Sequence, residues 1–506
     1  MKVLLVASLL VACFVLSQGS TYRRVCYYTN WAQWRQGIGK YKVSDVDPHL
    51  CTHIIYAFAY FRDTDGEIYP IGGQDDIDSY AALVALKQQN PDLKILLALG
   101  GWNFGSLKFS NMVADDVIRG QFVKSAVTFL RQHKFDGLDL DWEYPGSRGG
   151  RPADKANLVI LCQELISAFK ADATATGKHR LLLTAAVPAG RGTAMAGYDV
   201  KPISESLDFI NLMVYDLHGG WDGKTGHNSA LLPSSADTGD DVYLNMNETA
   251  AWWNKSGAPK DKIVVGMATY GHTFTLHDPS NSGVGAPAGT GPGGKYTGQS
   301  GFWSYYEVCQ DIETGGGAVE FDDESKVPYF VKNSLWVSYD NKRSMRLKAD
   351  WLKAEGYSGF MIWALDLDDF NKVCSSSAKR YPLINAIIDQ LGEVPATTPG
   401  GETMTTSGET TSEQTTEQTT EQTTEQTTKQ TTEQTTEQST QGTTDGGGEA
   451  FTCSGKDNGY YPHPSDCSKF YQCVEGRTFE SSCPSGLHWD VKVNACNWPE
   501  LAGCSV

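Results

Sequence analysis

Short apolar runs alternate along most of the chain with longer segments that have the apolar spacing of a helix. The short runs predict buried strands. Eight such strands are expected, at Val25–Tyr28, Ile54–Phe61, Lys94–Leu99, Gly137–Asp141, Leu181–Ala186, Phe209–Val214, Ile263–Ala268 and Gly359–Trp363. The longer segments predict amphipathic helices. They include Ile77–Gln89, Ala114–His133, Asn157–Ala171 and Arg343–Glu355.

Strands that alternate with helical crossovers in this way predict an α/β fold, the (β/α)8 TIM barrel, over residues 21–391. A doubly wound open sheet is the alternative. That fold usually carries a glycine-rich phosphate turn after its first strand, and Tyr27-Tyr28-Thr29-Asn30-Trp31 is not such a turn. The gap before the last strand is too long for one crossover. Residues 271–340 are rich in Gly, Tyr and Trp, and we expect them to form a small α+β insertion between strands 7 and 8.

The first 20 residues have a different character. Lys2 is followed by the apolar run Val3–Leu16 and by the small residues Ser17-Gln18-Gly19. This order is typical of a secretory signal peptide, and the run is shorter than the ~20 residues that a membrane-spanning helix needs. A buried first strand is the alternative, which the small polar residues before Tyr22 disfavour. We therefore expect a signal peptide at residues 1–20 and a secreted, extracellular protein without a membrane anchor.

The C-terminal part of the chain predicts a linker and a small second module. Residues 392–450 contain repeats of Thr-Thr-Glu-Gln and lack the apolar periodicity that a core requires, so they predict a disordered linker. An acidic partner-binding tail is the alternative. Residues 451–506 contain six cysteines, a density that predicts a disulfide-rich β module.

Composition and charge refine this picture. The net charge is −18, and residues 402–449 supply half of it, because they hold ten acids and one base (−10 + 1 = −9). So acidic a chain is a poor candidate for binding nucleic acid by charge. Five cysteines lie between the signal peptide and the linker, and their odd number predicts one free thiol, for which we choose Cys162. In an exported chain, Asn247 and Asn254 are candidate glycosylation sites.

The most informative segment is the fourth predicted strand and the residues around it, which read Phe-Asp-Gly-Leu-Asp-Leu-Asp-Trp-Glu-Tyr-Pro from residue 135. Alternate residues of a strand share a face, so Asp139, Asp141 and Glu143 point one way. The intervening Leu138, Leu140 and Trp142 point the other way, toward the helices. The acids must then line the barrel interior, with Glu143 at the C-terminal mouth where such barrels place active sites.

Three carboxylates on one face are costly to ionise together. Neighbours lie ~6.6 Å apart along the strand, which costs ~2.5 kcal/mol per ionised pair at an effective dielectric of ~20. We therefore expect the set to hold at least one proton near neutral pH, which suits a general acid. A metal site and a solvated charge run are the alternatives. The first lacks a nearby His other than His133, and the second does not explain the alternation with apolar residues.

At this motif the chain resembles the chitinases of glycoside hydrolase family 18, in particular the secreted animal type. The D-x-x-D-x-D-x-E signature is complete as Asp136, Asp139, Asp141 and Glu143. Further matching blocks are Lys94-Ile-Leu-Leu-Ala-Leu-Gly-Gly-Trp102-Asn103-Phe-Gly, Met213-Val-Tyr215-Asp216-Leu-His-Gly-Gly-Trp221, Tyr270-Gly-His272-Thr-Phe and Gly359-Phe-Met-Ile-Trp363-Ala-Leu-Asp.

The resemblance implies a substrate-assisted, retaining hydrolysis of chitin, for which the family is an exception to the usual two-carboxylate scheme. Glu143 would protonate the glycosidic oxygen while the substrate's acetamido carbonyl attacks the anomeric carbon to give an oxazolinium ion. Asp141 would orient the acetamido group, Asp139 would share a proton with Asp141, and Tyr215 would hydrogen-bond the acetamido oxygen. No metal or cofactor is implied.

Aromatic rings supply an expected substrate groove, because sugar faces stack on flat rings. The resemblance places Trp363 under the cleavage site. We expect the remaining binding residues to be Trp31, Trp102, Asn103, Met213, Asp216, Trp221, Tyr270 and His272.

Two positions depart from the family pattern. Asn211 stands where the acid-tolerant subclass often has a second His, and Gln299 stands where relatives place a substrate-contacting Glu. The resemblance also implies the disulfides Cys26–Cys51 and Cys309–Cys374.

The cysteine spacing of residues 451–506 resembles the peritrophin-A type chitin-binding module, carbohydrate-binding family 14. Spacing alone permits 15 connectivities, and the family implies Cys453–Cys473, Cys467–Cys504 and Cys483–Cys496. Tyr471, Trp489 and Trp498 are candidate sugar-stacking residues. Capping of the disulfides by these rings is the alternative role.

The sequence and the resemblance thus predict a secreted endochitinase without a cofactor, which acts as a monomer on chitin and chito-oligosaccharides. Two alternatives remain: a non-catalytic chitin-binding lectin, and an endo-N-acetylglucosaminidase that acts on glycoprotein N-glycans.

Overall fold

A computed structural model describes residues 22–392, 451–456, 459–474, 477–483, 488–491, 495–497 and 499–504. The predicted signal peptide and linker lie outside these residues. The chain divides into two units, at residues 1–396 and 397–506. Each is described by itself.

The first unit is built on a closed barrel of eight parallel strands. These are β1 (Arg23–Thr29), β2 (His53–Phe61), β4 (Lys94–Gly100), β5 (Gly137–Asp141), β6 (Leu182–Pro188), β7 (Phe209–Met213), β8 (Ile263–Ala268) and β15 (Gly359–Trp363). Neighbours pair in chain order, and β15 closes the ring by pairing with both β8 and β1. A short antiparallel strand, β3 (Ile68–Pro70), extends β2. The predicted (β/α)8 barrel is confirmed.

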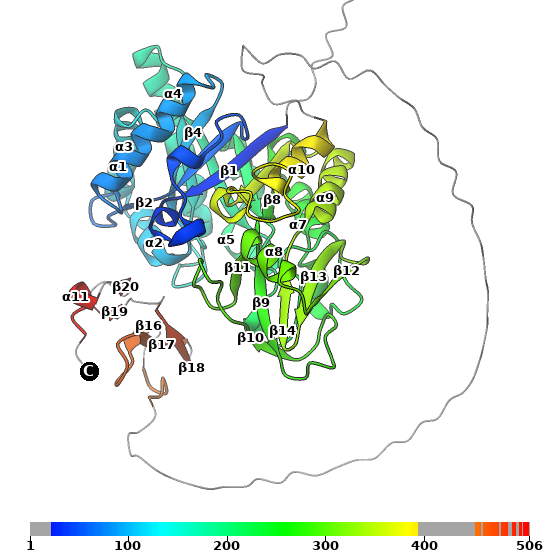
Figure 1. The fold of residues 1–506 in the computed structure, drawn as a ribbon. Helices are drawn as coiled ribbons and strands as arrows, with labels where there is room; N and C mark the ends of the chain where they lie inside the picture. The colour runs from blue at the N-terminus through cyan, green and yellow to red at the C-terminus, as the bar shows by residue number, and fades with distance from the viewer. Residues whose placement is uncertain are drawn as a thin grey trace, which may run out of the picture. The chain divides into compact units, whose positions relative to one another are not determined.

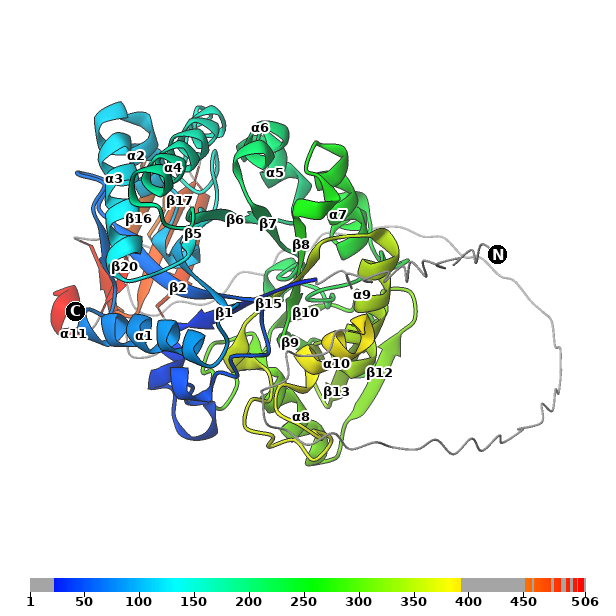
Figure 2. The ribbon, with the colours of Figure 1, turned by 90° about the horizontal axis from the view of Figure 1, so that it is seen from above.

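Helices surround the barrel, as the view from above shows (Figure 2). They are α1 (Gln74–Ala85), α2 (Leu107–Ala114), α3 (Asp116–Gln132), α4 (Asp154–Thr176), α5 (Arg191–Gly197), α6 (Val200–Ser206), α7 (Met246–Lys255), α9 (Lys342–Glu355) and α10 (Pro382–Leu391). One large apolar cluster fills the space between helices and strands, and a second, smaller one fills the barrel interior. Alternate strand residues therefore enter different cores.

Helix ends are where the sequence-based prediction was least accurate. The single helix predicted at Ala114–His133 is the end of α2 followed by α3. The break lies at Asp115, whose carboxylate accepts hydrogen bonds from the backbone N–H groups of Val117 and Ile118 and so caps α3. Helix α4 extends the predicted segment at both ends.

The predicted insertion between the seventh and eighth barrel strands is present. It forms a six-stranded antiparallel sheet of β9 (Tyr270–Leu276), β10 (Ala288–Thr290), β11 (Phe302–Ser304), β12 (Ala318–Asp322), β13 (Val327–Lys332) and β14 (Leu335–Ser338), with helix α8 (Tyr305–Glu313). Figure 1 shows this sheet as a layer of its own beside the barrel. Because β9 begins two residues after β8 ends, the insertion grows from the C-terminal mouth of the barrel.

The second unit holds a three-stranded antiparallel sheet and a short hairpin. The strands are β16 (Gly459–Pro462), β17 (Lys469–Val474) and β18 (Arg477–Ser482), then β19 (His488–Asp490) and β20 (Ala495–Asn497), followed by helix α11 (Pro499–Ala502). The structure contains the expected disulfides Cys26–Cys51, Cys309–Cys374, Cys453–Cys473 and Cys467–Cys504. The Cys496 side chain of the fifth expected pair lies outside the described residues. Cys162 is a buried free thiol, as predicted.

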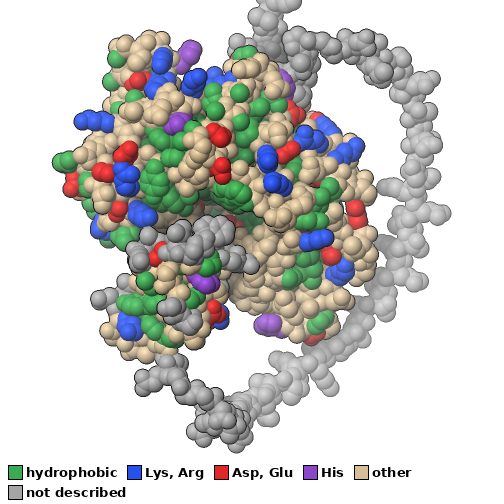
Figure 3. All heavy atoms as spheres, turned by 60° about the vertical axis from the view of Figure 1, so that its left-hand side comes forward, with side chains coloured by type: hydrophobic (Ala, Val, Ile, Leu, Met, Phe, Trp, Pro, Cys, Tyr) green, Lys and Arg blue, Asp and Glu red, His purple; other side chains and the backbone are tan. Residues whose placement is uncertain are grey.

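Two further features concern membranes and nucleic acids, neither of which is an expected partner. No helix in the described part of the chain combines the length and apolar character that crossing a membrane requires. On the face drawn in Figure 3, Lys and Arg side chains are scattered and do not gather into one basic patch.

Candidate active site

The side chains of strand β5 alternate between the outer and the inner face of the barrel, as the sequence predicts. Leu138, Leu140 and Trp142 belong to the cluster between barrel and helices, where the Trp142 ring stacks on Phe109 with a centroid separation of 5.0 Å. The Trp142 indole N–H donates to Ser106 Oγ at 2.7 Å, so its polar atom is also satisfied. With these side chains fixed outward, the acids of β5 must face the barrel interior.

Asp136, the first acid of the signature, lies outside the interior. Its carboxylate accepts a hydrogen bond from the Ile95 backbone N–H at 2.7 Å and forms an ion pair with Lys87. These contacts tie the residue before β5 to the start of β4. The structure thus gives Asp136 a role in holding the strand, separate from the interior acids.

Asp139 is buried and held by three donors from three other strands. It accepts from the Tyr27 hydroxyl at 2.7 Å, from Thr184 Oγ1 at 2.5 Å and from Asn211 Nδ2 at 3.2 Å. Burial raises the pKa of Asp139 to about 6, although these hydrogen bonds to the carboxylate oppose the rise. Asp139 is therefore anchored across the whole barrel interior.

Asp141, one step nearer the mouth, is held far less firmly. Its Oδ1 atom is buried and has no hydrogen-bond partner among the described residues. Burial raises the pKa of Asp141 well above its usual range, and the charges of Glu143 and Asp139 raise it further. Within the described structure no hydrogen bond joins Asp141 to Asp139, whose oxygens already accept from Tyr27, Thr184 and Asn211. Asp141 is thus the acid with unused hydrogen-bonding capacity.

Glu143 lies just beyond β5, with 8% of its surface exposed. Burial raises the pKa of Glu143 to about 7, against the opposing effects of Arg148 and of a hydrogen bond from Tyr144. The Arg148 guanidinium donates to the Glu143 carbonyl at 2.9 Å and to the Trp102 carbonyl at 3.1 Å, and stacks 3.5 Å above the Trp102 ring. A carboxyl group with this pKa can donate a proton and take one back near neutral pH.

The physical cause of these shifts differs from the one the sequence suggested. Spacing along the strand pointed to repulsion between carboxylates, whereas burial is the largest cause for Asp139, Asp141 and Glu143 alike. Repulsion between carboxylates is the second-largest influence on the pKa of Asp141, and not on the pKa of the other two acids. The expectation that the set retains protons near neutral pH agrees with all three raised pKa values.

A second polar cluster is formed by a residue just after β7 and two residues at the start of β9. Asp216 Oδ1 accepts from the Tyr270 hydroxyl at 2.5 Å and lies 2.8 Å from His272 Nε2, while His272 Nδ1 lies 2.8 Å from the Gly301 carbonyl. Both ring nitrogens face acceptors, which only the doubly protonated imidazolium satisfies. Burial alone would lower the pKa of His272, but the hydrogen bond and charge of Asp216 outweigh it and raise the pKa.

The predicted aromatic residues gather at the barrel mouth. Trp31, Trp102 and Trp221 are 39%, 59% and 63% exposed, which is unusual for Trp side chains. Trp363, at the end of β15, is only partly buried and packs on Tyr27 and Phe58 of the interior, at centroid separations of 5.1 and 6.0 Å. One face of Trp102 is covered by Arg148.

The other predicted binding residues differ in exposure. Met213 and Tyr215 are buried in the interior cluster, and the Tyr215 hydroxyl lies 3.5 Å from Met361 Sδ. Asn103 is exposed on the turn Trp102–Phe104, and Gln299 is exposed on the loop between β10 and β11. Within the described residues, no group of three or more His, Cys, Asp or Glu side chains is arranged to hold a metal ion.

Sequence reasoning missed four residues that shape the site, namely Tyr27, Thr184, Tyr144 and Arg148. Two of them carried a usable signal. Tyr27 and Thr184 occupy inward positions of β1 and β6 by the same alternation that revealed the acids, and Asp139 pairs directly with Thr184 in the sheet register. Arg148 lies on a loop, where no periodicity indicates direction.

The aromatic residues of the second unit have unequal exposure. Tyr471 stacks on Phe451 at a centroid separation of 4.4 Å and also contacts the tilted ring of His463 at 5.1 Å. Trp489 is only 4% exposed and stacks on Phe470 at 4.0 Å. Trp489 is therefore largely covered within the second unit by Phe470 and Tyr460, and its role in sugar stacking stays a prediction. Trp498 lies outside the described residues.

The contacts of Arg148 yield a test of the site's electrostatics. In Arg148→Met the pKa of Glu143 should rise above about 7, by about one pH unit, because a positive charge that favours the carboxylate has been removed. Carboxyl-carbon NMR of selectively Glu-labelled protein measures this titration. Arg151→Met is the matched control, since Arg151 on the same loop contacts Ser110 and Asn111 instead. Equal midpoints in the wild type and Arg148→Met would show that Arg148 does not act on Glu143.

Comparisons with known proteins agree with this geometry. Residues 23–368 match the model of "Glycosyl hydrolases family 18", and residues 453–504 match that of the "Chitin binding Peritrophin-A domain". The chain is 41% identical to mouse chitotriosidase-1 over 483 residues, which covers 95% of this chain and 96% of the mouse protein.

Solved structures give the same result. The crystal structure of an immunomodulatory active chitinase from Trichuris suis is 44% identical with a TM-score of 0.70, covering 73% of this chain and all of that one. Human YKL-39, described as a pseudo-chitinase that retains chitooligosaccharide binding, is 41% identical with a TM-score of 0.69, covering 74% and 100%. The chain therefore belongs to glycosyl hydrolase family 18 and carries a peritrophin-A type chitin-binding domain.

Proposed function

We propose that the protein is a secreted endochitinase, which hydrolyses β-1,4 linkages between N-acetylglucosamine units of chitin. The observation that carries this proposal is Glu143 at the barrel mouth, with its pKa raised to about 7. Exposed Trp rings around the mouth suit a neutral polysaccharide, because sugar faces stack on aromatic rings without requiring charge.

The proposed reaction uses the acids of β5 in separate roles. Glu143 protonates the glycosidic oxygen, and the substrate's own acetamido carbonyl attacks the anomeric carbon. The bond to the glycosidic oxygen breaks, the leaving sugar departs as an alcohol, and an oxazolinium ion forms. The unpartnered Oδ1 of Asp141 supports a role in accepting the acetamido N–H and orienting that group. Glu143 then deprotonates a water molecule, which attacks the anomeric carbon and opens the oxazolinium ring. The anomeric configuration of the sugar is therefore retained. Asp139, held by three donors, maintains negative potential beneath Asp141.

Binding residues are proposed in two groups. Trp363 forms the floor of the cleavage site, and Trp31, Trp102 and Trp221 stack on flanking sugars. Tyr215 donates to the acetamido oxygen, and its burial beside the acids supports this position. The remaining contacts are assigned to Asn103, Met213, Asp216, Tyr270 and His272.

A non-catalytic lectin is the principal rival, because YKL-39 is described as a pseudo-chitinase of this family. The presence of Glu143 with a raised pKa favours an enzyme. An endo-N-acetylglucosaminidase for glycoprotein N-glycans is the second rival, and the chitin-binding domain argues against it. The signal peptide predicted at residues 1–20 supports export, and we propose that the protein acts outside the cell as a monomer.

The catalytic role of Glu143 is tested by Glu143→Gln, which keeps the shape of the side chain but cannot donate and recover the proton. We expect turnover of a chromogenic chitobioside to fall at least ~100-fold. The matched control Glu320→Gln, on exposed strand β12, should retain wild-type activity. Undiminished turnover in a folded Glu143→Gln variant would refute the assignment.

The second unit is tested by removing residues 451–506. A tethered binding domain raises the local concentration of an insoluble substrate, so the truncated protein should lose activity on crystalline chitin. Its activity on soluble chito-oligosaccharides should stay within about twofold of the full chain. Hydrolysis assays on both substrates measure this ratio. Equal losses on the two substrates would indicate that the second unit supports the barrel instead.

A further inference from the structure

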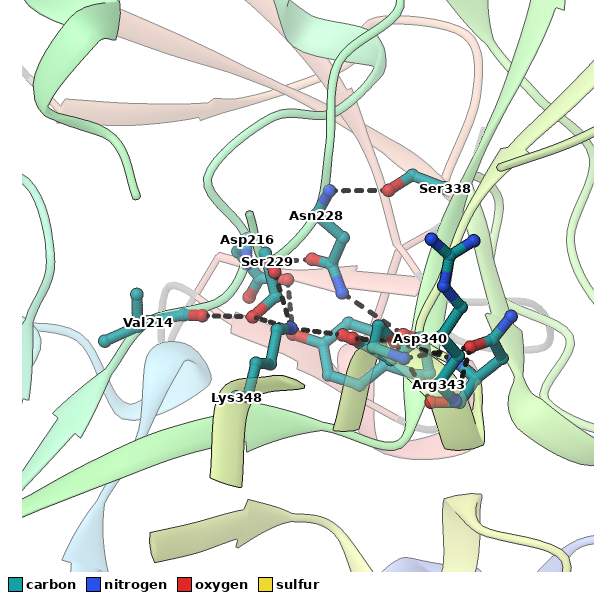
Figure 4. A network of polar contacts seen from close by, with 11 residues as sticks. Val214, Asp216, Asn228, Ser229, Ser338, Asp340, Arg343 and Lys348 are labelled. Atoms are coloured by element: carbon teal, nitrogen blue, oxygen red, sulfur yellow. Dashed lines mark hydrogen bonds and ion pairs between the residues drawn. The ribbon is translucent and has the colours of Figure 1, made fainter. Parts of the chain in front are cut away.

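A buried lysine lies behind the segment that carries Tyr215 and Asp216. Lys348, on helix α9, is fully buried, and its ammonium group donates to Asp340 Oδ2 at 2.7 Å and to the Ser229 carbonyl at 2.6 Å. Ser229 Oγ lies 3.2 Å from the same nitrogen. Figure 4 shows the lysine reaching from its helix into this cluster. A fully buried side chain cannot contact a polysaccharide, so any effect on catalysis must pass through other residues.

Ser229 connects the lysine to the end of β7. Its hydroxyl donates to the Val214 carbonyl at 2.6 Å, and Val214 immediately precedes Tyr215. The residues Lys348, Ser229 and Val214 are all buried. Ser229 therefore restrains the backbone at Val214, next to Tyr215, and its own carbonyl accepts a hydrogen bond from Lys348. Figure 4 shows Lys348, Ser229 and Val214 in line.

Asn228 makes the parallel connection to Asp216. Its Oδ1 accepts from the Asp216 backbone N–H at 2.9 Å, and its Nδ2 donates to the Tyr270 carbonyl at 3.2 Å. The Asn228 backbone N–H donates to Ser338 Oγ on β14 at 2.7 Å. Asp216 has φ = +55°, a left-handed conformation that a non-glycine residue adopts only when its surroundings hold it there. The contacts of Asn228 supply that restraint.

The network joins three elements, of which the loop after β7 is distant in sequence from the other two. Lys348 comes from α9, Asp340 from the residues after β14, and the pair Asn228–Ser229 from the loop after β7. Ser344 Oγ also donates to Asp340 Oδ1 at 2.7 Å, which orients the carboxylate toward the lysine. A buried ion pair is weak evidence for stability, because apolar residues of similar volume commonly fill the same space at no loss. The contacts that the ion pair makes therefore say more about its role than its presence does.

We propose that Lys348 is a positioning residue, which holds Tyr215 and Asp216 in their catalytic geometry through Ser229 and its neighbour Asn228. The inference rests on the proposed chitinase function and deepens it. Tyr215 must meet the acetamido oxygen where charge develops in the transition state, so its displacement should lower kcat more than it raises KM.

The decisive variant is Lys348→Met/Asp340→Asn, which removes the ion pair without leaving an unpaired buried charge. Lys348→Met alone would leave Asp340 uncompensated and is expected to lower the melting temperature. In the double variant we expect the melting temperature to recover toward wild type. Its kcat on a chromogenic chitobioside should remain about 10-fold or more below wild type, with KM within about twofold. Ser229→Ala should reproduce the loss of kcat.

A matched control exists at the opposite end of the barrel. Lys262 donates to the carbonyls of Ser204 and Leu207, each at 2.7 Å, and Ser204 Oγ donates to the Val200 carbonyl at 2.6 Å. This lysine–serine pair repeats the chemistry away from the mouth. Lys262→Met and Ser204→Ala should therefore leave kcat unchanged even where they lower the melting temperature.

Coupling to Tyr215 separates positioning from general support of the fold. Tyr215→Phe should lower kcat strongly in the wild type and clearly less in the Lys348→Met/Asp340→Asn background, because the hydroxyl there is already misplaced. Wild-type kcat in either the double variant or Ser229→Ala would overturn the inference, as would an equal effect of Tyr215→Phe in both backgrounds. If the wild type itself does not cleave the chitobioside, the proposed function fails instead.

Discussion

Two carboxyl groups lie on the inward face of β5 and a third lies just beyond its end, and most of the site's chemistry depends on the cost of burying them. Water cannot solvate these groups, so each one retains its proton to a higher pH than an exposed carboxyl would. Hydrogen bonds from the barrel reduce the cost of burying an ionised carboxyl group more for Asp139 than for Asp141. Asp139 receives hydrogen bonds from Tyr27, Thr184 and Asn211, whereas Asp141 keeps an unpartnered oxygen. Depth along a single strand thus separates an anchored acid from one that is available to a ligand.

The rest of the mouth is organised around the last acid of the strand. Arg148 links Glu143 to Trp102 and lowers the pKa that burial has raised, so that one loop adjusts both proton transfer and the aromatic surface. On the other side, Asp216 joins His272 and Tyr270 into a second charged group. Because the insertion begins at the mouth, its sheet contributes β9 to that group and β14 to the buried network behind it.

The sequence predicted the barrel, the insertion and the inward acids. Each was read from the regular spacing of apolar and polar residues along strands and helices. The same alternation contained the positions of Tyr27 and Thr184, yet their contacts depend on strand register, which the sequence of one strand does not specify. Loop residues such as Arg148 follow no period. Burial of Trp489 against Phe470 depends on how short strands of a disulfide-rich module fold over each other. Lys348 was hidden for a further reason, since a lysine within a helical pattern normally faces water.

The central claim is that burial keeps Glu143 protonated close to neutral pH, and the dependence of kcat/KM on pH tests it most directly. For a soluble chito-oligosaccharide, this quantity reports the ionisation of the free enzyme. The account predicts that kcat/KM falls as pH rises through about 7, because the general acid loses its proton there. A fall centred near 4.5, the ordinary value for the pKa of a glutamic acid, would contradict it.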